Sequence, residues 1–178
     1  MRIHLTTLRA RCARACLAGD PHPVSTLIGH TPMTLDQLFQ HISQDPFARF
    51  LGIELLELRE GYSRVAMTVE EHMLNFHGIP HGGVIFSLAD AAFAAASNSH
   101  GQTAVALNVS INFLAAVPVG TRLYAEATEE SLGRRTALYR LAVIIEDGTL
   151  VALGHGLVYR KQERLLSAMP DRGVDYAG

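Results

Sequence analysis

The chain has 178 residues and a nearly balanced charge, with 15 Lys and Arg against 17 Asp and Glu for a formal net charge of −2 at pH 7. So small a charge provides no basic field for nucleic acid, and we expect no nucleic-acid partner. Hydrophobic residues make up 48% of the chain, which is enough for one domain with a sizeable core.

The first 32 residues differ in charge from the rest, because they contain four arginines and a single acid, Asp20. We interpret residues 1–32 as an N-terminal extension that is poorly ordered or dispensable. An organelle-targeting segment is an alternative interpretation of the same arginines. The expected domain then covers residues 33–162, and residues 163–178 form a C-terminal tail.

The only two cysteines, Cys12 and Cys16, both lie in this extension. Their spacing leaves open a redox or metal pair. In either case disulfides do not hold the domain together, so a reducing, cytoplasmic compartment is expected.

The first elements are a short helix and two strands. Thr34 is expected to cap a helix over residues 35–43, which ends before Pro46. Two β-rich runs follow at 53–60 and 62–69, and the second alternates well between the two faces of a strand. Because a single glycine separates the two runs, they predict a hairpin.

A central helix is predicted over residues 84–98, with Ala, Leu and Phe on every side, so it should be surrounded by other protein. It is too short to span a membrane and carries one charge, Asp90. Leaving a buried carboxylate unpaired costs on the order of several kcal/mol, so the presence of Asp90 in this apolar helix indicates a functional role or a partner. At the start of the helix, Gly82 and Gly83 follow Pro80. Backbone N–H groups of a first helical turn have no intrahelical partner and can polarise an oxygen that gains negative charge.

Four more strands are expected after the helix, at 103–114, 121–131, 136–146 and 149–160. The pair Asp147-Gly148 indicates a tight turn between the last two. Two strands, one buried helix and then a meander of four strands predict an α+β domain in which an antiparallel sheet wraps a helix.

The segment that leads into the central helix carries the motif Asn-x-x-Gly-x-x-His-Gly-Gly, made by Asn75, Gly78, His81, Gly82 and Gly83, with Asp90 nine residues after the His. This motif, in register ahead of the run of strands, resembles the hotdog-fold acyl-CoA thioesterases, specifically their phenylacetate-catabolism (PaaI-type) branch. The resemblance extends from about Phe47 to Arg160.

The resemblance implies a hotdog fold and a cytoplasmic hydrolase that cleaves acyl-CoA thioesters. It favours aryl-acetyl or hydroxylated aryl-acetyl CoA from phenylacetic acid degradation, with medium-chain acyl-CoA as the alternative. A homodimer should form the active sites, and a dimer of dimers, a homotetramer, is the expected assembly. We expect no metal and no cofactor, since CoA is part of the substrate and a thiolate leaves easily, and no membrane partner.

The expected mechanism assigns a role to each motif residue. The Gly82 N–H donates to the acyl carbonyl, with Gly83 as a possible second donor, and Asn75 positions the thioester or the attacking water. Asp90 acts as general base on water, or as a nucleophile through an anhydride. His81 is expected to hold the loop by hydrogen bonds rather than to transfer protons.

Helix geometry adds a requirement for two chains. Gly82 and Asp90 are eight residues apart, which at about 1.5 Å per residue separates them by roughly 12 Å. A donor and a base that act on one carbonyl must both lie about 3 Å from the reacting atoms. A catalytic site therefore needs the Asn75 and Gly82 end of one chain to face Asp90 of another.

Several further residues are candidates for substrate contacts. Ala106 and Asn108 lie in the strand that should line the site, although some relatives place a hydroxyl residue at the position of Ala106. Arg134 and Arg135 lie at a strand turn where relatives often bind the CoA phosphates. The alternative is that they are two ordinary exposed arginines on a turn. Met73 and Phe76 can line the acyl pocket, whereas Phe86 is expected in the core. The spacing of His72, His77 and His81 is compatible with zinc, but an ordinary His-rich loop is favoured.

Two other functions remain open from the sequence. A hotdog hydratase or dehydratase would arrange its acid and base differently and would lack the His-Gly-Gly at the start of this helix. A non-catalytic acyl-CoA-binding module would keep the binding cavity and dispense with Asp90. Release of free thiol from acyl-CoA separates these functions.

Overall fold

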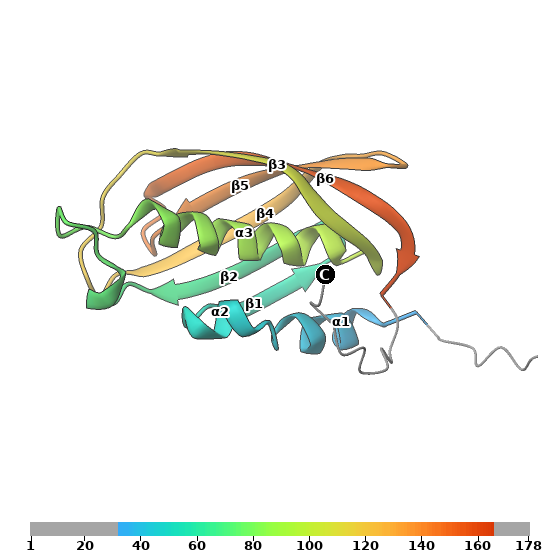
Figure 1. The fold of residues 1–178 in the computed structure, drawn as a ribbon, viewed down its shortest axis with the longest axis horizontal. Coiled ribbons are helices and arrows are strands. Elements are labelled where there is room, and N and C mark those ends of the chain that lie inside the picture. The colour runs from blue at the N-terminus through green and yellow to red at the C-terminus, as the bar shows by residue number, and fades with distance from the viewer. Residues whose placement is uncertain (1–31, 166–178) are drawn as a thin grey trace, which may run out of the picture.

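The computed structural model describes residues 32–165, so most of the predicted extension and most of the predicted tail lie outside the described residues. The elements are, in chain order, α1 (Leu35–Ile42), α2 (Pro46–Phe50), β1 (Glu54–Arg59), β2 (Tyr62–Thr68), the 3₁₀ helix η1 (Glu71–Met73), α3 (Gly82–Asn98), β3 (Gln102–Phe113), β4 (Arg122–Leu132), β5 (Thr136–Ile144) and β6 (Leu150–Arg164). One antiparallel sheet curves around α3, and α1 and α2 lie along its β1 side (Figure 1). The predicted α+β arrangement is confirmed.

The two short helices begin at side-chain caps. Thr34 accepts a hydrogen bond from the Gln37 N–H at 3.3 Å, and the Gln37 side chain accepts one from the Thr34 N–H at 2.9 Å, so the predicted cap is present. Pro46 lies in the first turn of a second helix, α2, in which Asp45 caps the Ala48 N–H at 2.7 Å. The prediction missed α2, since a proline fits the first turn of a helix as well as the region behind one.

The strand order in the sheet is β1-β2-β4-β5-β6-β3. The predicted hairpin of β1 and β2 is confirmed, as is the β5–β6 turn, where Gly148 has φ +87°. The predicted meander of four strands is wrong, because β3 pairs with β6 and only β4, β5 and β6 are consecutive neighbours. After α3 has crossed the sheet, the chain re-enters the sheet as β3, at the edge opposite β1 (Figure 1). Strand periodicity carries no information about that crossing. Strand β6 also continues to Arg164, into the predicted tail.

The central helix packs against β2, β4 and β5. Phe93 on α3 is buried and meets Tyr139 on β5 edge-to-face, with ring centroids 5.6 Å apart. Gly156 on β6 makes room for this ring, since a Cβ there would lie 2.6 Å from Phe93 Cζ. The helix is thus seated closely on the sheet, and this contact fixes its height above the strands.

Polar contacts fix the C-terminal end of α3. The Ser99 hydroxyl accepts from the Gly61 N–H at 2.7 Å and donates to the Ala96 carbonyl. The Asn98 amide donates to the Ala104 carbonyl at 3.2 Å and accepts from the Ala104 N–H at 2.9 Å. These bonds tie the helix to the β1–β2 turn and to the start of β3. Across residues 32–165, no helix is long and apolar enough to cross a membrane.

Candidate active site

The loop before α3 is built around Asn75. Its side-chain oxygen accepts from the His77 N–H at 2.8 Å. Its backbone N–H donates to the Ile79 carbonyl, and its backbone carbonyl accepts from the Gly78 N–H. Gly78 has φ +76°, a conformation that glycine adopts at little cost. Because Oδ1 is used by the turn, the amide nitrogen is the part of the Asn75 side chain that remains free to donate, with no partner among the described residues.

His81 caps the N-terminus of α3, where its Nδ1 accepts from the Gly83 N–H at 2.9 Å. This contact is the kind expected of a residue that holds the loop in place. It also means that the second oxyanion donor expected at Gly83 is already bonded within the chain. The Gly82 N–H has no hydrogen-bond partner in the described part of the chain, so it is the first-turn amide available to a substrate.

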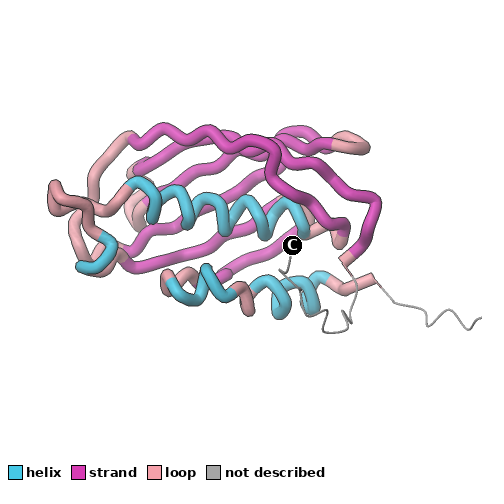
Figure 2. The backbone as a smooth tube through the Cα atoms, viewed as in Figure 1, coloured by secondary structure: helices cyan, strands magenta, loops and turns pink. Residues whose placement is uncertain are grey.

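Gly82 and Asn75 line one cavity of about 350 Å³ together with Ile85 and the end of β3. The loop before α3 and the β3–β4 connection meet at this end of the molecule (Figure 2). A Cβ at Gly82 would lie 3.2 Å from Cζ of Phe113, so glycine allows the Phe113 ring to approach the helix start. The structure therefore brings together two of the predicted catalytic residues.

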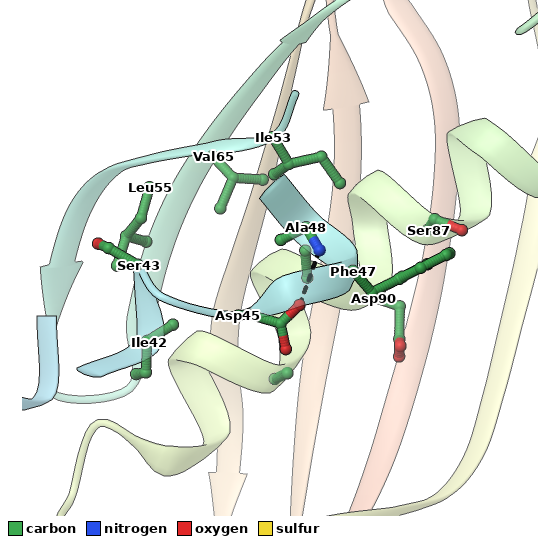
Figure 3. Close-up of a pocket in the computed structure, with 12 residues that line it drawn as sticks. Ile42, Ser43, Asp45, Phe47, Ala48, Ile53, Leu55, Val65, Ser87 and Asp90 are labelled. Atoms are coloured by element: carbon green, nitrogen blue, oxygen red, sulfur yellow. Dashed lines mark hydrogen bonds between the residues drawn. The ribbon is translucent and has the colours of Figure 1, made fainter. Parts of the chain in front are cut away.

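Asp90 lies elsewhere, on the wall of a separate cavity between α3, β1, β2 and the α1–α2 segment (Figure 3). The carboxylate is partly buried, and it has no hydrogen-bond or ion-pair partner among residues 32–165. Burial raises the pKa of the Asp90 carboxyl above its ordinary value. A partly buried carboxylate with a raised pKa on a cavity wall makes Asp90 a candidate functional residue.

The cavities of Gly82 and of Asp90 share no lining residue. Within one chain, the predicted donor and the predicted base therefore do not face the same space. This is the separation that helix geometry required.

The expected substrate-contact residues lie outside both cavities. Ala106 and Asn108 are exposed on β3, and Arg134 and Arg135 are exposed on the β4–β5 turn. This turn is held by Arg160, which the sequence did not single out. Its guanidinium donates to the Gly133 carbonyl at 2.7 Å and its N–H to the Arg135 carbonyl at 2.8 Å.

The three residues considered for the acyl pocket, Met73, Phe76 and Phe86, line neither cavity. Met73 is buried in the core, and Phe76 is 92% exposed. Phe86 is 36% exposed, so the expectation that it packs in the core is wrong; it lies on a face of α3 that residues 32–165 leave uncovered.

Residues that the sequence reasoning missed line the cavity of Asp90. Ser87 precedes Asp90 by nearly one turn of α3, and its hydroxyl donates to the Gly83 carbonyl at 2.8 Å. Phe47 and Ala48 come from α2. The helical spacing from Asp90 could have found Ser87, whereas no local pattern predicts that α2 packs near α3.

The His-rich loop does not gather metal ligands. His72 contacts Glu70, with Nδ1 and Oε2 3.3 Å apart. In the part of the chain that the structure describes, no group of three or more His, Cys, Asp or Glu side chains could hold a metal ion.

Comparisons with known proteins agree with this architecture. The family model described as Thioesterase superfamily matches residues 77–152. A putative esterase of Archaeoglobus fulgidus is 47% identical over 119 residues, which cover 67% of this chain and 77% of that protein. The acyl-coenzyme A thioesterase PaaI of Escherichia coli is 41% identical over 116 residues, covering 65% of this chain and 83% of that protein.

Two solved structures share the fold. The structure of E. coli PaaI, from the phenylacetic acid degradation operon, matches with a TM-score of 0.70 and 36% identity over 74% of this chain and 99% of that one. A hypothetical thioesterase of Streptococcus pneumoniae with coenzyme A matches with a TM-score of 0.65 and 25% identity, over 71% and 98% of the two chains. Sequence, fold and motif agree, and this chain belongs to the Thioesterase superfamily as a hotdog-fold enzyme of the PaaI type.

Proposed function

We propose that this protein hydrolyses acyl-CoA thioesters at a site shared between two subunits. One observation carries the proposal: α3 presents to two different cavities the Gly82 N–H and the Asp90 carboxylate, neither of which has a partner in the described part of the chain. Each group alone is an incomplete site, and a second chain supplies the missing half. The E. coli relative is an acyl-coenzyme A thioesterase, and the S. pneumoniae protein has coenzyme A in its structure.

In the proposed reaction, the thioester carbonyl accepts a hydrogen bond from the Gly82 N–H of one subunit. The Asn75 amide group donates to the thioester or to the attacking water. Asp90 of the second subunit takes a proton from that water while the water oxygen forms a bond to the acyl carbon. The C–S bond then breaks, and the CoA thiolate leaves with the proton returned to sulfur or to solvent. The burial that raises the pKa of Asp90 makes it a stronger base.

The free edge of the sheet supports the two-chain arrangement. Strand β3 is an edge strand, and its side chains Val105, Leu107 and Phe113 are 42%, 56% and 52% exposed. An apolar edge strand with free backbone groups is suited to pair with another strand. Two β3 edges related by a two-fold axis would run antiparallel, and the Gly82 end of each α3 would then lie toward the middle of the other. Ala106 and Asn108 would lie at this interface, and a dimer of dimers is the proposed assembly.

The proposed substrates are aryl-acetyl or hydroxylated aryl-acetyl CoA, with medium-chain acyl-CoA as the alternative. The support is the resemblance to the PaaI branch and the E. coli relative from the phenylacetic acid degradation operon. Arg134 and Arg135 are exposed cations on the β4–β5 turn, suited to bind the phosphates of CoA.

A panel of acyl-CoAs at one fixed concentration tests the proposal, with a thiol-reactive dye to detect free CoA. We expect rapid thiol release from phenylacetyl-CoA or 4-hydroxyphenylacetyl-CoA, and release at background from the Asp90→Asn variant. Tight binding of these CoA esters with no release of thiol from any of them would contradict the enzyme and would favour a binding module.

A further inference from the structure

The loop before α3 carries Phe76, whose ring is 92% exposed. This loop projects from one end of the molecule (Figure 2), and its backbone is held in place. The Asn75 side chain accepts from the His77 N–H at 2.8 Å, and an isolated β-bridge joins Leu74 to Pro80 across the base of the loop. The His77 ring lies against Phe76, with ring centroids 4.0 Å apart. The chain therefore presents an apolar ring outward on a fixed base.

A stripe along α3 is also left uncovered by residues 32–165. Phe86, Asp90 and Ala94 are spaced four residues apart, so they lie on one face of the helix and form what we call the α3 stripe. Phe86 is 36% exposed, Ala94 is exposed and Asp90 is partly exposed. Apart from its carboxylate the α3 stripe is apolar, and an apolar side chain from another chain can pack on it.

The proposed reaction limits how far the loop of one chain can lie from the α3 stripe of the other. The Asn75 amide and the partner's Asp90 must each lie about 3 Å from the reacting groups, so the two side chains end less than about 10 Å apart. Phe76 follows Asn75 directly, with about 3.8 Å between their Cα atoms. The exposed ring is therefore confined to the neighbourhood of the partner's Asp90.

We infer that the Phe76 ring of each subunit packs on the α3 stripe of the other subunit and forms one wall of the shared site. The inference rests on the proposed function, because the two-chain site brings the loop and the stripe together. Within its own chain, Phe76 lines neither the Gly82 cavity nor the Asp90 cavity. The Phe86 ring on the stripe provides an aromatic neighbour. Phe76 touches the partner chain and not the reacting atoms, so it is a positioning residue.

Photo-crosslinking tests this contact without a measurement of hydrolysis. The photoreactive analogue p-benzoylphenylalanine replaces Phe76 in the full chain, and mass spectrometry maps the peptides joined on irradiation. We expect cross-links from position 76 to residues 86–94 of the other chain, identified as intermolecular by mixing with isotope-labelled chains. The same probe at Leu132, which is 47% exposed at the end of β4, is the control and should not reach that peptide. Dimers in which position 76 cross-links only to other segments would overturn the inference.

Kinetics of defined heterodimers show which chain the ring serves. As homodimers, Phe76→Ser should lower kcat/KM at least about tenfold, and Phe76→Leu, which keeps an apolar side chain, should recover most of that loss. A heterodimer is then purified with Phe76→Ser in one chain and Asp90→Asn in the other. If the ring serves the partner's Asp90, one site is intact, and the heterodimer has about half of the wild-type activity. Half of the activity of the Phe76→Ser homodimer would show instead that the ring acts within its own chain, and would overturn the inference.

The two tests separate this inference from the proposed function. Cross-links from position 76 to the partner's α3 stripe, with no thiol release from any acyl-CoA, would support the contact and contradict the proposed hydrolysis. Thiol release by a dimer in which position 76 never reaches the α3 stripe would overturn the inference and leave the hydrolysis intact.

Discussion

Gly82 and Asp90 lie on the same helix, about two turns apart, and they line different cavities. In the proposed mechanism, the helix carries two halves of a reaction centre and presents them to two spaces. The Gly82 N–H and the Asp90 carboxylate, both without a partner among residues 32–165, would then act together only when a second chain is present.

Asp90→Asn keeps the shape of the side chain and removes the base. We expect kcat for the preferred acyl-CoA to fall by on the order of 10²-fold or more. In the wild type, kcat/KM should fall as the pH is lowered through the pKa of Asp90, because a base acts only when ionised. Since burial raises that pKa, the acid limb should lie above the ordinary range of an aspartate. Asp36→Asn, on exposed α1, is the control, and equal turnover by both variants would remove Asp90 from the mechanism.

The same substitution should stabilise the folded chain at neutral pH. The pKa of Asp90 is higher in the folded than in the unfolded chain, so the folded state binds the proton more tightly. Wild-type stability then falls as the pH rises through the folded pKa, and the cost persists at neutral pH. Urea unfolding should show Asp90→Asn to be the more stable protein at pH 7. The difference should vanish below the ordinary pKa of aspartate, and a less stable variant at neutral pH would contradict the assigned burial.

Gly156 is a packing requirement of the central helix. A Cβ at this position would lie 2.6–2.8 Å from three atoms of the buried Phe93 ring. We expect Gly156→Ala to destabilise the fold by about 1–3 kcal/mol, as overpacked cores do. Because a smaller residue at 93 relieves the clash, the cost of Gly156→Ala should shrink in a Phe93→Leu background. Additive free energies of unfolding in that double-mutant cycle would show that the ring contact is not the cause.

The elements were predictable from sequence because their signals are local. Alternation gives β2, the Asp-Gly pair gives the β5–β6 turn, and Thr34 gives the start of α1. The position of β3 beside β6 depends on where α3 delivers the chain, and strand periodicity does not contain that information. Long-range packing thus decided what the local patterns could not.

The candidate site was also predictable only in part. The motif pointed to Asn75, Gly82 and Asp90, and helix geometry predicted that the last two lie too far apart to act together within one chain. The use of the Gly83 N–H by His81 became visible only once the cap geometry was known. The α2 wall of the Asp90 cavity depends on contacts between segments far apart in sequence, so Phe47 could not be found from its neighbours.

Mixing two inactive variants tests the shared site most directly. Asp90→Asn and Asn75→Ala are combined under conditions that allow subunits to exchange, and heterodimers are counted by native mass spectrometry. In each heterodimer one site receives both defects and the other receives none. When half of the dimers are mixed, activity should return to about a quarter of the wild-type value, because half of the sites in half of the dimers are intact. Activity that stays at background while heterodimers form would contradict the two-chain site and the roles of Asn75 and Asp90.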